Sequence, residues 1–224
     1  MPTPSSPLPP IRFRRSTRAR RLSLRIDPAS ASVIVTLPPR GTQAAGRALL
    51  QAHAGWVEAR LARLPAPLVL TDGVTISLGG IPHRIRHQPN GRTGIKDGEL
   101  QVTGAPEFLP RRVLDFLRAE AGRRLTTLAA EIASPAGLTP RRVTMKDTRT
   151  RWGSCTATGT LMFCWRLVMA PAEVQHYVVA HEVAHLRHMN HSPAFWALVI
   201  QLTPHRAVAD HWLDKHGTGL MRVG

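Results

Sequence analysis

The sequence predicts an α+β fold, and three observations carry that prediction. In the first hundred residues, several short segments alternate apolar and polar residues and are separated by Gly, Pro and Asn, as short strands are. Two long segments, 43–64 and 110–133, carry apolar residues at helical spacing. The last third of the chain combines strand-like segments with helix-start signals. Strands and helices in separate stretches are typical of the α+β class.

The N-terminal half divides into a tail and a β-rich region. Residues 1–11 are rich in Pro and Ser, which predicts a disordered tail. Residues 12–105 are expected to form an N-terminal subdomain rich in strands, with one helix. Segments 21–27 and 32–38 alternate with period two and predict a hairpin, while 43–64 predicts the helix. Further short strands are expected from VTISLGG, HRIRH and ELQVTG.

Residues 106–224 are expected to form the second domain. An amphipathic helix at 110–133 opens it, with Pro110 in the first turn. Strands are predicted from the segments that follow, RRVTMKD, TRWGSC and TLMFCWRL. Helices are then predicted from Pro171, from the pair Ser192 and Pro193, and from about Arg206 to His216.

Composition narrows the class of protein. Hydrophobic residues make up 43% of the 224, enough for a folded domain with a core. No apolar run reaches the roughly eighteen residues that a membrane span needs, and the arginine-containing N-terminus has no apolar signal segment. A cytoplasmic protein is therefore expected. Cys155 and Cys164 are too few for a disulfide framework and are expected to be reduced thiols in adjacent strands.

The charge of the chain is strongly basic. Thirty Lys and Arg stand against fourteen Asp and Glu, which gives a net charge of +16. Residues 12–25 hold seven arginines and no acid, and residues 111–151 hold ten cations against four acids. Such a chain attracts polyanions, so a basic nucleic-acid-associated protein is a second functional hypothesis. The alternative is a solvated basic surface without a partner.

The strongest chemical signal is the HExxH sequence formed by His181, Glu182 and His185. On a helix, residues four apart lie on one face about 6 Å apart along the axis, so two imidazoles converge on one metal ion. Glu182 is rotated by about 100° from His181, near enough to act on metal-bound water without ligating. The surrounding YVVAHEVAHL is apolar nearly all round, and polar groups buried there are costly unless they bind a metal.

A catalytic zinc site needs a third protein ligand, and His188 and His191 are the near candidates. If the helix continues, His188 lies about 10 Å from His181, too far to share one ion. His191 returns to the site if the helix ends near His188, and Asn190 and Ser192 provide signals for such a break. The pattern HExxHxxHxxH then has the ligand spacing of the metzincins, with His188 where those have Gly. His191 is therefore the predicted third ligand.

Several motifs together resemble the bacterial YgjP-like metallopeptidase family, which is related to SprT-like and other zincin peptidases. They are RRSTRARRLSLRI (14–26), RWGSC (151–155), WRL (165–167) and YVVAHEVAHLRHMNHSPAFW (177–196). The resemblance covers most of the chain. It implies a zincin-like domain in which a small twisted sheet, with an edge strand over the active site, packs on the HExxH helix.

The resemblance also implies a chemistry. Zinc would be bound by His181, His185 and His191, and Glu182 would be the general base of a peptidase that hydrolyses peptide bonds through a metal-activated water. Peptides or proteins are the expected substrates, with no membrane partner. Combined with the charge, the family relationship makes a DNA-localised protease like the SprT-like enzymes the second hypothesis.

Three secondary expectations concern the surroundings of the site. The oxyanion of the reaction needs another donor, and Tyr177, His188 and Arg166 are candidates among which the sequence does not choose. The stretch TLMFCWRL is either the edge strand that binds substrate or a core strand. Buried aromatic rings are expected around the active-site helix, namely Trp152, Trp165 and Trp196.

Overall fold

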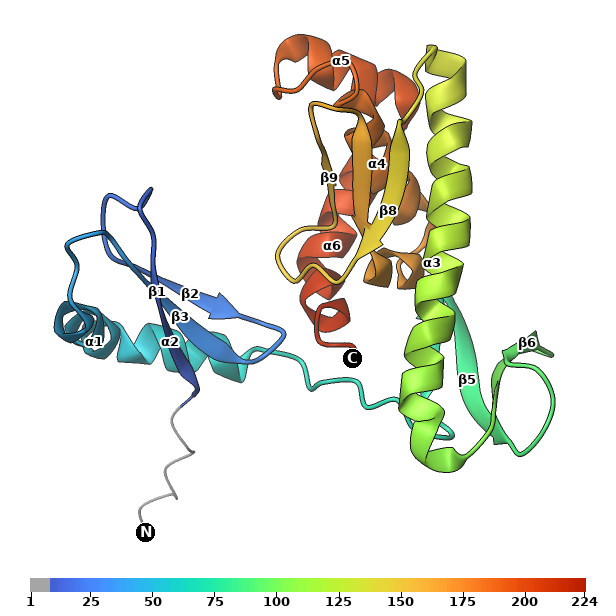
Figure 1. Cartoon of the computed structure of the whole chain (residues 1–224), viewed down its shortest axis with the longest axis horizontal. Helices are drawn as coiled ribbons and strands as arrows, with labels where there is room; N and C mark the ends of the chain where they lie inside the picture. Colours follow the sequence, from blue (N-terminus) through green and yellow to red (C-terminus); the bar gives the residue numbers. More distant parts are fainter. Residues whose placement is uncertain (1–8) are drawn as a thin grey trace. The chain divides into compact units, whose positions relative to one another are not determined.

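The computed structural model describes residues 9–224, which form two compact units that divide between Pro67 and Leu68 (Figure 1). Residues 1–8, which make up most of the predicted tail, lie outside the described residues. The boundary expected between residues 105 and 106 lies inside the second unit. No helix of the described part is long and apolar enough to cross a membrane.

The first unit is a three-stranded sheet with two helices. Strand β3 (Ser32–Leu37) lies in the centre, parallel to β1 (Ile11–Arg15) and antiparallel to β2 (Ser23–Asp27). The predicted hairpin is confirmed. The predicted single helix is two helices, α1 (Gln43–Ala52) and α2 (Ala54–Ala62), because the backbone leaves helical geometry at His53.

A small core joins the sheet and the helices of this unit. Val33, Val35 and Leu37 of β3 are buried together with Val57 of α2. Gly46 permits the close approach of α1, since a Cβ there would lie 3.0 Å from side-chain atoms of the sheet. The apolar side of each strand therefore faces the helices, and the other side faces away from them.

The second unit begins with a four-stranded sheet. Its strands are β4 (Thr75–Leu78), β5 (Ile81–Gln88), β6 (Gly94–Lys96) and β7 (Glu99–Thr103), in the order β4-β5-β7-β6. After a 3₁₀ turn, η1 (Pro106–Phe108), the long helix α3 (Leu109–Ala133) packs against β7 and further along against β8 (Arg142–Lys146). Its buried residues recur every four positions, so one stripe contributes to a core shared by both sheets of the unit. This shared core explains why residues 75–103 belong to the second unit.

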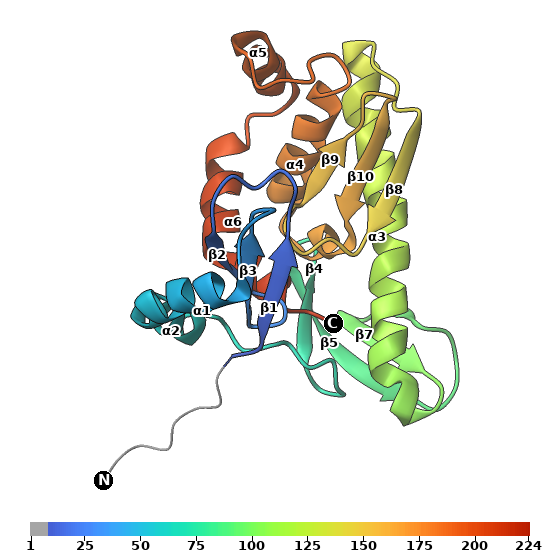
Figure 2. The same ribbon diagram turned by 60° about the vertical axis from the view of Figure 1, so that its left-hand side comes forward.

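The other sheet carries the predicted strands of the C-terminal region. Strand β10 (Thr160–Cys164) lies between β8, to which it is parallel, and β9 (Gly153–Cys155), to which it is antiparallel. The edge-strand interpretation of TLMFCWRL was therefore wrong and its core-strand interpretation is confirmed, because β10 has a neighbour on each side. The WRL segment forms a 3₁₀ helix, η3 (Trp165–Met169). In Figure 2, β9, β10 and β8 run side by side, with β9 nearest the helix α4 (Ala172–Ala184) and β8 nearest α3.

Helix α4 is the buried centre of the second unit. It contacts α3, the strand β9, α5 (Pro193–Leu202) and α6 (Arg206–Leu220), which explains its apolar sequence on nearly all sides. Trp165 is buried, whereas Trp152 and Trp196 are half-buried against the same core. Mixed small sheets and helices, with one sheet packed on the HExxH helix, confirm the predicted α+β class.

Candidate metal centre

The end of α4 positions the first residues of the site. His181 and Glu182 lie in its last turn, and His185 is the residue that caps it. The chain then turns, with the backbone N–H of His188 bonded to the carbonyl of Ala184 at 3.0 Å. The helix therefore ends about one turn earlier than the sequence predicted.

The turn after α4 differs in detail from the expected one. Asn190 does not adopt the left-handed conformation, since Ala31 and Asp97 are the non-glycine residues with positive φ among residues 9–224. His188 therefore needs no glycine-like backbone, although metzincins have Gly at this spacing. The start of the next helix follows the prediction, because the Ser192 hydroxyl accepts a hydrogen bond from the N–H of Phe195 and Pro193 is the first helical residue.

This turn brings His191 back to α4. The Nε2 atoms of His191 and His181 lie 3.1 Å apart, and one ligand atom from each of His181, His185 and His191 lies within 4.8 Å of the others. Such a group could hold a metal ion. His188 contributes only its backbone: its carbonyl accepts a hydrogen bond of 2.9 Å from Nδ1 of His185. That bond leaves Nε2 of His185 as the nitrogen with a free lone pair.

Burial favours the neutral imidazole at His181 and His185. The pKa of His181 is lowered to about 4, first by burial and then by the neighbouring His185, His191 and Arg206. Burial also lowers the pKa of His185. A neutral imidazole has the lone pair that a metal ion requires, so these side chains are in the ligating form at neutral pH.

Glu182 is a buried carboxyl group beside the imidazoles. Its side chain is 7% exposed, and burial raises its pKa to about 7, against the opposing charge of Arg151. The strand β9 passes directly over it. A Cβ at Gly153 would lie 2.6 Å from Cγ of Glu182, so glycine is the residue that allows this approach.

Aromatic rings pack against the imidazoles of the cluster. The ring of Phe195 stacks on His185 at 4.5 Å between centroids, and Trp196 lies 5.8 Å from His181. The guanidinium of Arg206 lies 3.8 Å over Trp196. Tyr177 is 6.1 Å from His181, and its pKa is raised to about 12, first by burial and then by the charge of Asp210. These contacts restrict the rotamers of the candidate ligands.

A cavity of about 430 Å³ opens above the cluster. Its lining comes from α4, from the segment after it, from β9 and from Arg151, which precedes β9. The lining residues are Arg151, Gly153, Ser154, Cys155, His181, Glu182, His185, Met189 and His191. The sequence did not identify Arg151, Cys155 or Met189 as part of the site, although the RWGSC motif contains the first two. Both cysteines are free thiols, and Cys164 is buried away from this lining.

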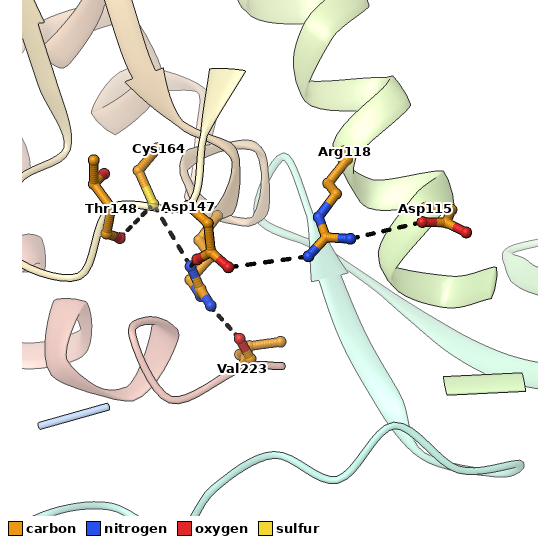
Figure 3. Close-up of polar contacts among 7 residues, drawn as sticks. Asp115, Arg118, Asp147, Thr148, Cys164 and Val223 are labelled. Atoms are coloured by element: carbon orange, nitrogen blue, oxygen red, sulfur yellow. Dashed lines mark hydrogen bonds and ion pairs between the residues drawn. The ribbon is translucent and has the colours of Figure 1, made fainter. Parts of the chain in front are cut away.

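Arg166, one of the three oxyanion candidates, is not among the residues that line this cavity. Figure 3 shows the residues around Arg166, among them Asp147, Cys164 and Val223. The Arg166 side chain is fully buried, donates from Nε to the carbonyl of Val223 at 2.8 Å, and forms an ion pair with Asp147. Asp147 also lies 4.0 Å from Arg118 of α3. Arg166 therefore joins the loop before β9 to the C-terminal segment and does not line the cavity.

The family model of the YgjP-like metallopeptidase domain matches residues 20–216. The chain belongs to this family. Members are metallopeptidases, so a metal at the imidazole cluster and peptide or protein substrates agree with the membership. The resemblance inferred from the motifs is thus confirmed.

A solved structure is also similar to part of the chain. The crystal structure of the metallopeptidase zymogen of Pyrococcus abyssi abylysin is 20% identical, with 41% of this chain and 93% of that chain covered and a TM-score of 0.37. A comparison with curated proteins found no match.

Proposed function

We propose that the chain is a zinc-dependent peptidase in which His181, His185 and His191 hold the metal and Glu182 is the general base. One observation carries the proposal. Three imidazoles from two sides of a turn converge to within 4.8 Å of one another, directly beside a buried carboxyl group with a raised pKa. A structural histidine cluster has no need of that carboxyl group.

The donor set fits zinc. Three neutral nitrogen ligands with space for one further ligand are the usual composition of a catalytic zinc site. The hydrogen bond from His185 to the carbonyl of His188 is the kind of outer contact that orients a ligating imidazole. His191 is exposed, so it borders the cavity and leaves the open position accessible to substrate.

In the proposed hydrolysis, the metal and Glu182 have separate roles. Zinc, when bound, polarises the scissile carbonyl and makes a water molecule more acidic. Glu182 takes a proton from that water and delivers it to the leaving amine. Its position in a buried pocket under Gly153 supports this role, because a carboxyl group with a pKa near neutrality can both accept and release a proton at pH 7.

Strand β9 is the candidate binding surface for the substrate backbone. It is the edge of its sheet next to the cavity, and Gly153, Ser154 and Cys155 all line that cavity. An extended peptide that pairs with this edge gains backbone hydrogen bonds, which depend little on side chains. We therefore propose unstructured segments as substrates, with weak sequence preference.

The proposal is tested with an unstructured protein such as casein. The purified chain is expected to cleave it, to lose this activity when a chelator removes the metal, and to recover it with one equivalent of zinc. Glu182→Gln removes the base and preserves shape, so zinc content should stay and cleavage should be lost. Glu173→Gln, the same change in the first turn of α4, is the matched control and should remain active. Full activity in the Glu182→Gln variant would contradict the mechanism.

A further inference from the structure

The first unit has an unusual charge distribution. Between residues 9 and 67 the chain has eleven arginines, no lysine and two acids, Asp27 and Glu58. All eleven arginines are exposed. Asp27 is 8% exposed, and its carboxylate accepts hydrogen bonds from Ser30 and from the backbone of Ala29. Glu58 is therefore the single exposed carboxylate of the described part of this unit.

The arginines of this unit are not neutralised locally. None of the ion pairs formed among residues 9–224 involves an arginine of the first unit. In the second unit, by contrast, cations of the other basic stretch are paired on α3: Arg111 with Asp115, and Arg123 and Arg124 with Glu120. All seven arginines of residues 12–25 therefore lack an ion pair, whereas four of the ten cations in residues 111–151 have one.

The sheet gathers part of this charge on one face. In β1, Phe13 packs into the core of the unit, so the alternation of the strand puts Arg12 and Arg14 on the opposite face. Register then aligns Arg12 with Ile34 of β3, and Ile34 with Arg25 of β2. Two arginines thus flank the central strand about 10 Å apart, and Arg14 lies about 7 Å further along.

Further arginines stand at the end of the same sheet. The loop between β1 and β2 folds back on the end of β3, where the N–H of Ser16 donates to the carbonyl of Leu37 at 2.9 Å. A hollow of about 560 Å³ lies there, lined in part by Arg20 and Arg40. The basic face, defined as Arg12, Arg14, Arg25, Arg20 and Arg40, is therefore built on ordered strands and turns.

We infer that the basic face binds nucleic acid through its phosphates. The guanidinium group forms paired hydrogen bonds with phosphate oxygens, and the unit uses arginine to the exclusion of lysine. The described outer face has no aromatic side chain on which a base could stack, since Ile34 and Thr36 lie between the arginines. Binding is therefore independent of base sequence. The lack of aromatic anchors on this face likewise disfavours its insertion into a lipid surface.

The test uses the full chain and a fluorescent duplex of random sequence. Wild type is expected to bind it at about 50 mM salt and to lose affinity steeply as salt rises, because each neutralised phosphate releases counterions. The triple variant Arg12→Gln, Arg14→Gln, Arg25→Gln removes three contacts. Its log–log salt slope should be smaller by about 2.7, since each contact contributes about 0.9. Its thermal unfolding and zinc content should match wild type, because the three side chains are exposed.

The matched control is Arg86→Gln, Arg111→Gln, Arg123→Gln, which removes the same net charge from arginines paired with carboxylates. This control should keep the wild-type slope. Equal losses in the two triple variants would overturn the inference in favour of net charge alone. Two other results would also overturn it: no binding of wild type to the duplex at about 50 mM salt, or tighter binding to vesicles of anionic phospholipid than to the duplex. These outcomes do not depend on peptidase activity.

Discussion

Glu182 should destabilise the metal-free protein at high pH, and Glu182→Gln should relieve this. In the folded chain the pKa of Glu182 is about 7, whereas the ordinary value is 4.5. The folded state therefore binds its proton more tightly than the unfolded state does. The stability contributed by this proton is fully present below pH 4.5 and is lost as pH rises through 7.

The size of the effect follows from the two values. A shift of 2.5 units corresponds to about 3.4 kcal/mol of lost stability once the carboxyl group is ionised, of which about 0.8 kcal/mol is already lost at pH 5. Glutamine has no charge to bury. The free energy of unfolding of Glu182→Gln minus that of wild type should therefore increase by about 2.5 kcal/mol between pH 5 and pH 9.

Urea unfolding of the zinc-free chain at several pH values measures this difference. The comparison between variants cancels the titration of all other groups that the substitution leaves unperturbed. Glu173→Gln, on the exposed first turn of α4, should show no comparable pH trend. A difference for Glu182→Gln that stays constant from pH 5 to pH 9 would refute the raised pKa, and with it the physical basis for this residue as a base.

Three further substitutions test other parts of the account. His191→Ala should reduce zinc content well below one per chain by metal analysis, while His188→Ala should stay near wild type, because only its carbonyl contacts the site; the reverse order would identify a different third ligand. Gly153→Ala should keep zinc but lower casein cleavage by about tenfold or more, because its Cβ displaces the carboxyl group of Glu182, the proposed base; unchanged turnover would contradict that close approach. Asp147→Ala should lower the free energy of unfolding by about 2–3 kcal/mol in urea, because it leaves the buried guanidinium of Arg166 without its counterion. This loss is smaller than the one expected for a fully buried ion pair, because the Asp147 carboxylate is 44% exposed. Asp115→Ala, whose partners are exposed, should cost less than about 1 kcal/mol, and equal losses would refute the distinction.

The candidate ligands were accessible from the sequence because their spacing has a direct geometric meaning. An i, i+4 pair of histidines in an apolar helix converges on one side, and Ser192 followed by Pro193 marks the start of the next helix. The residue at which the helix ends could not be predicted with the same precision as the ligands. The helix ends at Ala184 because of hydrogen bonds in the following turn, and no residue type in that turn predicts these bonds.

Features that depend on contacts between distant segments were not predictable in the same way. TLMFCWRL has the pattern of a strand, but its central position in the sheet is set by pairing with both β8 and β9. Arg166 lies within the segment TLMFCWRL that was predicted as a strand, and it was a candidate oxyanion donor. It instead binds Asp147 and Val223, which are distant in sequence. The approach of Gly153 to Glu182 likewise required the packing of β9 on α4.

A zinc titration of the metal-free chain tests the central proposal most directly. Zinc is added in steps, and casein cleavage and bound metal are measured on the same samples. The proposed centre predicts that both rise together and stop at one equivalent per chain, and that a His181→Ala, His185→Ala variant shows neither. Cleavage by the metal-free chain, or one tightly bound zinc in the double variant, would contradict it.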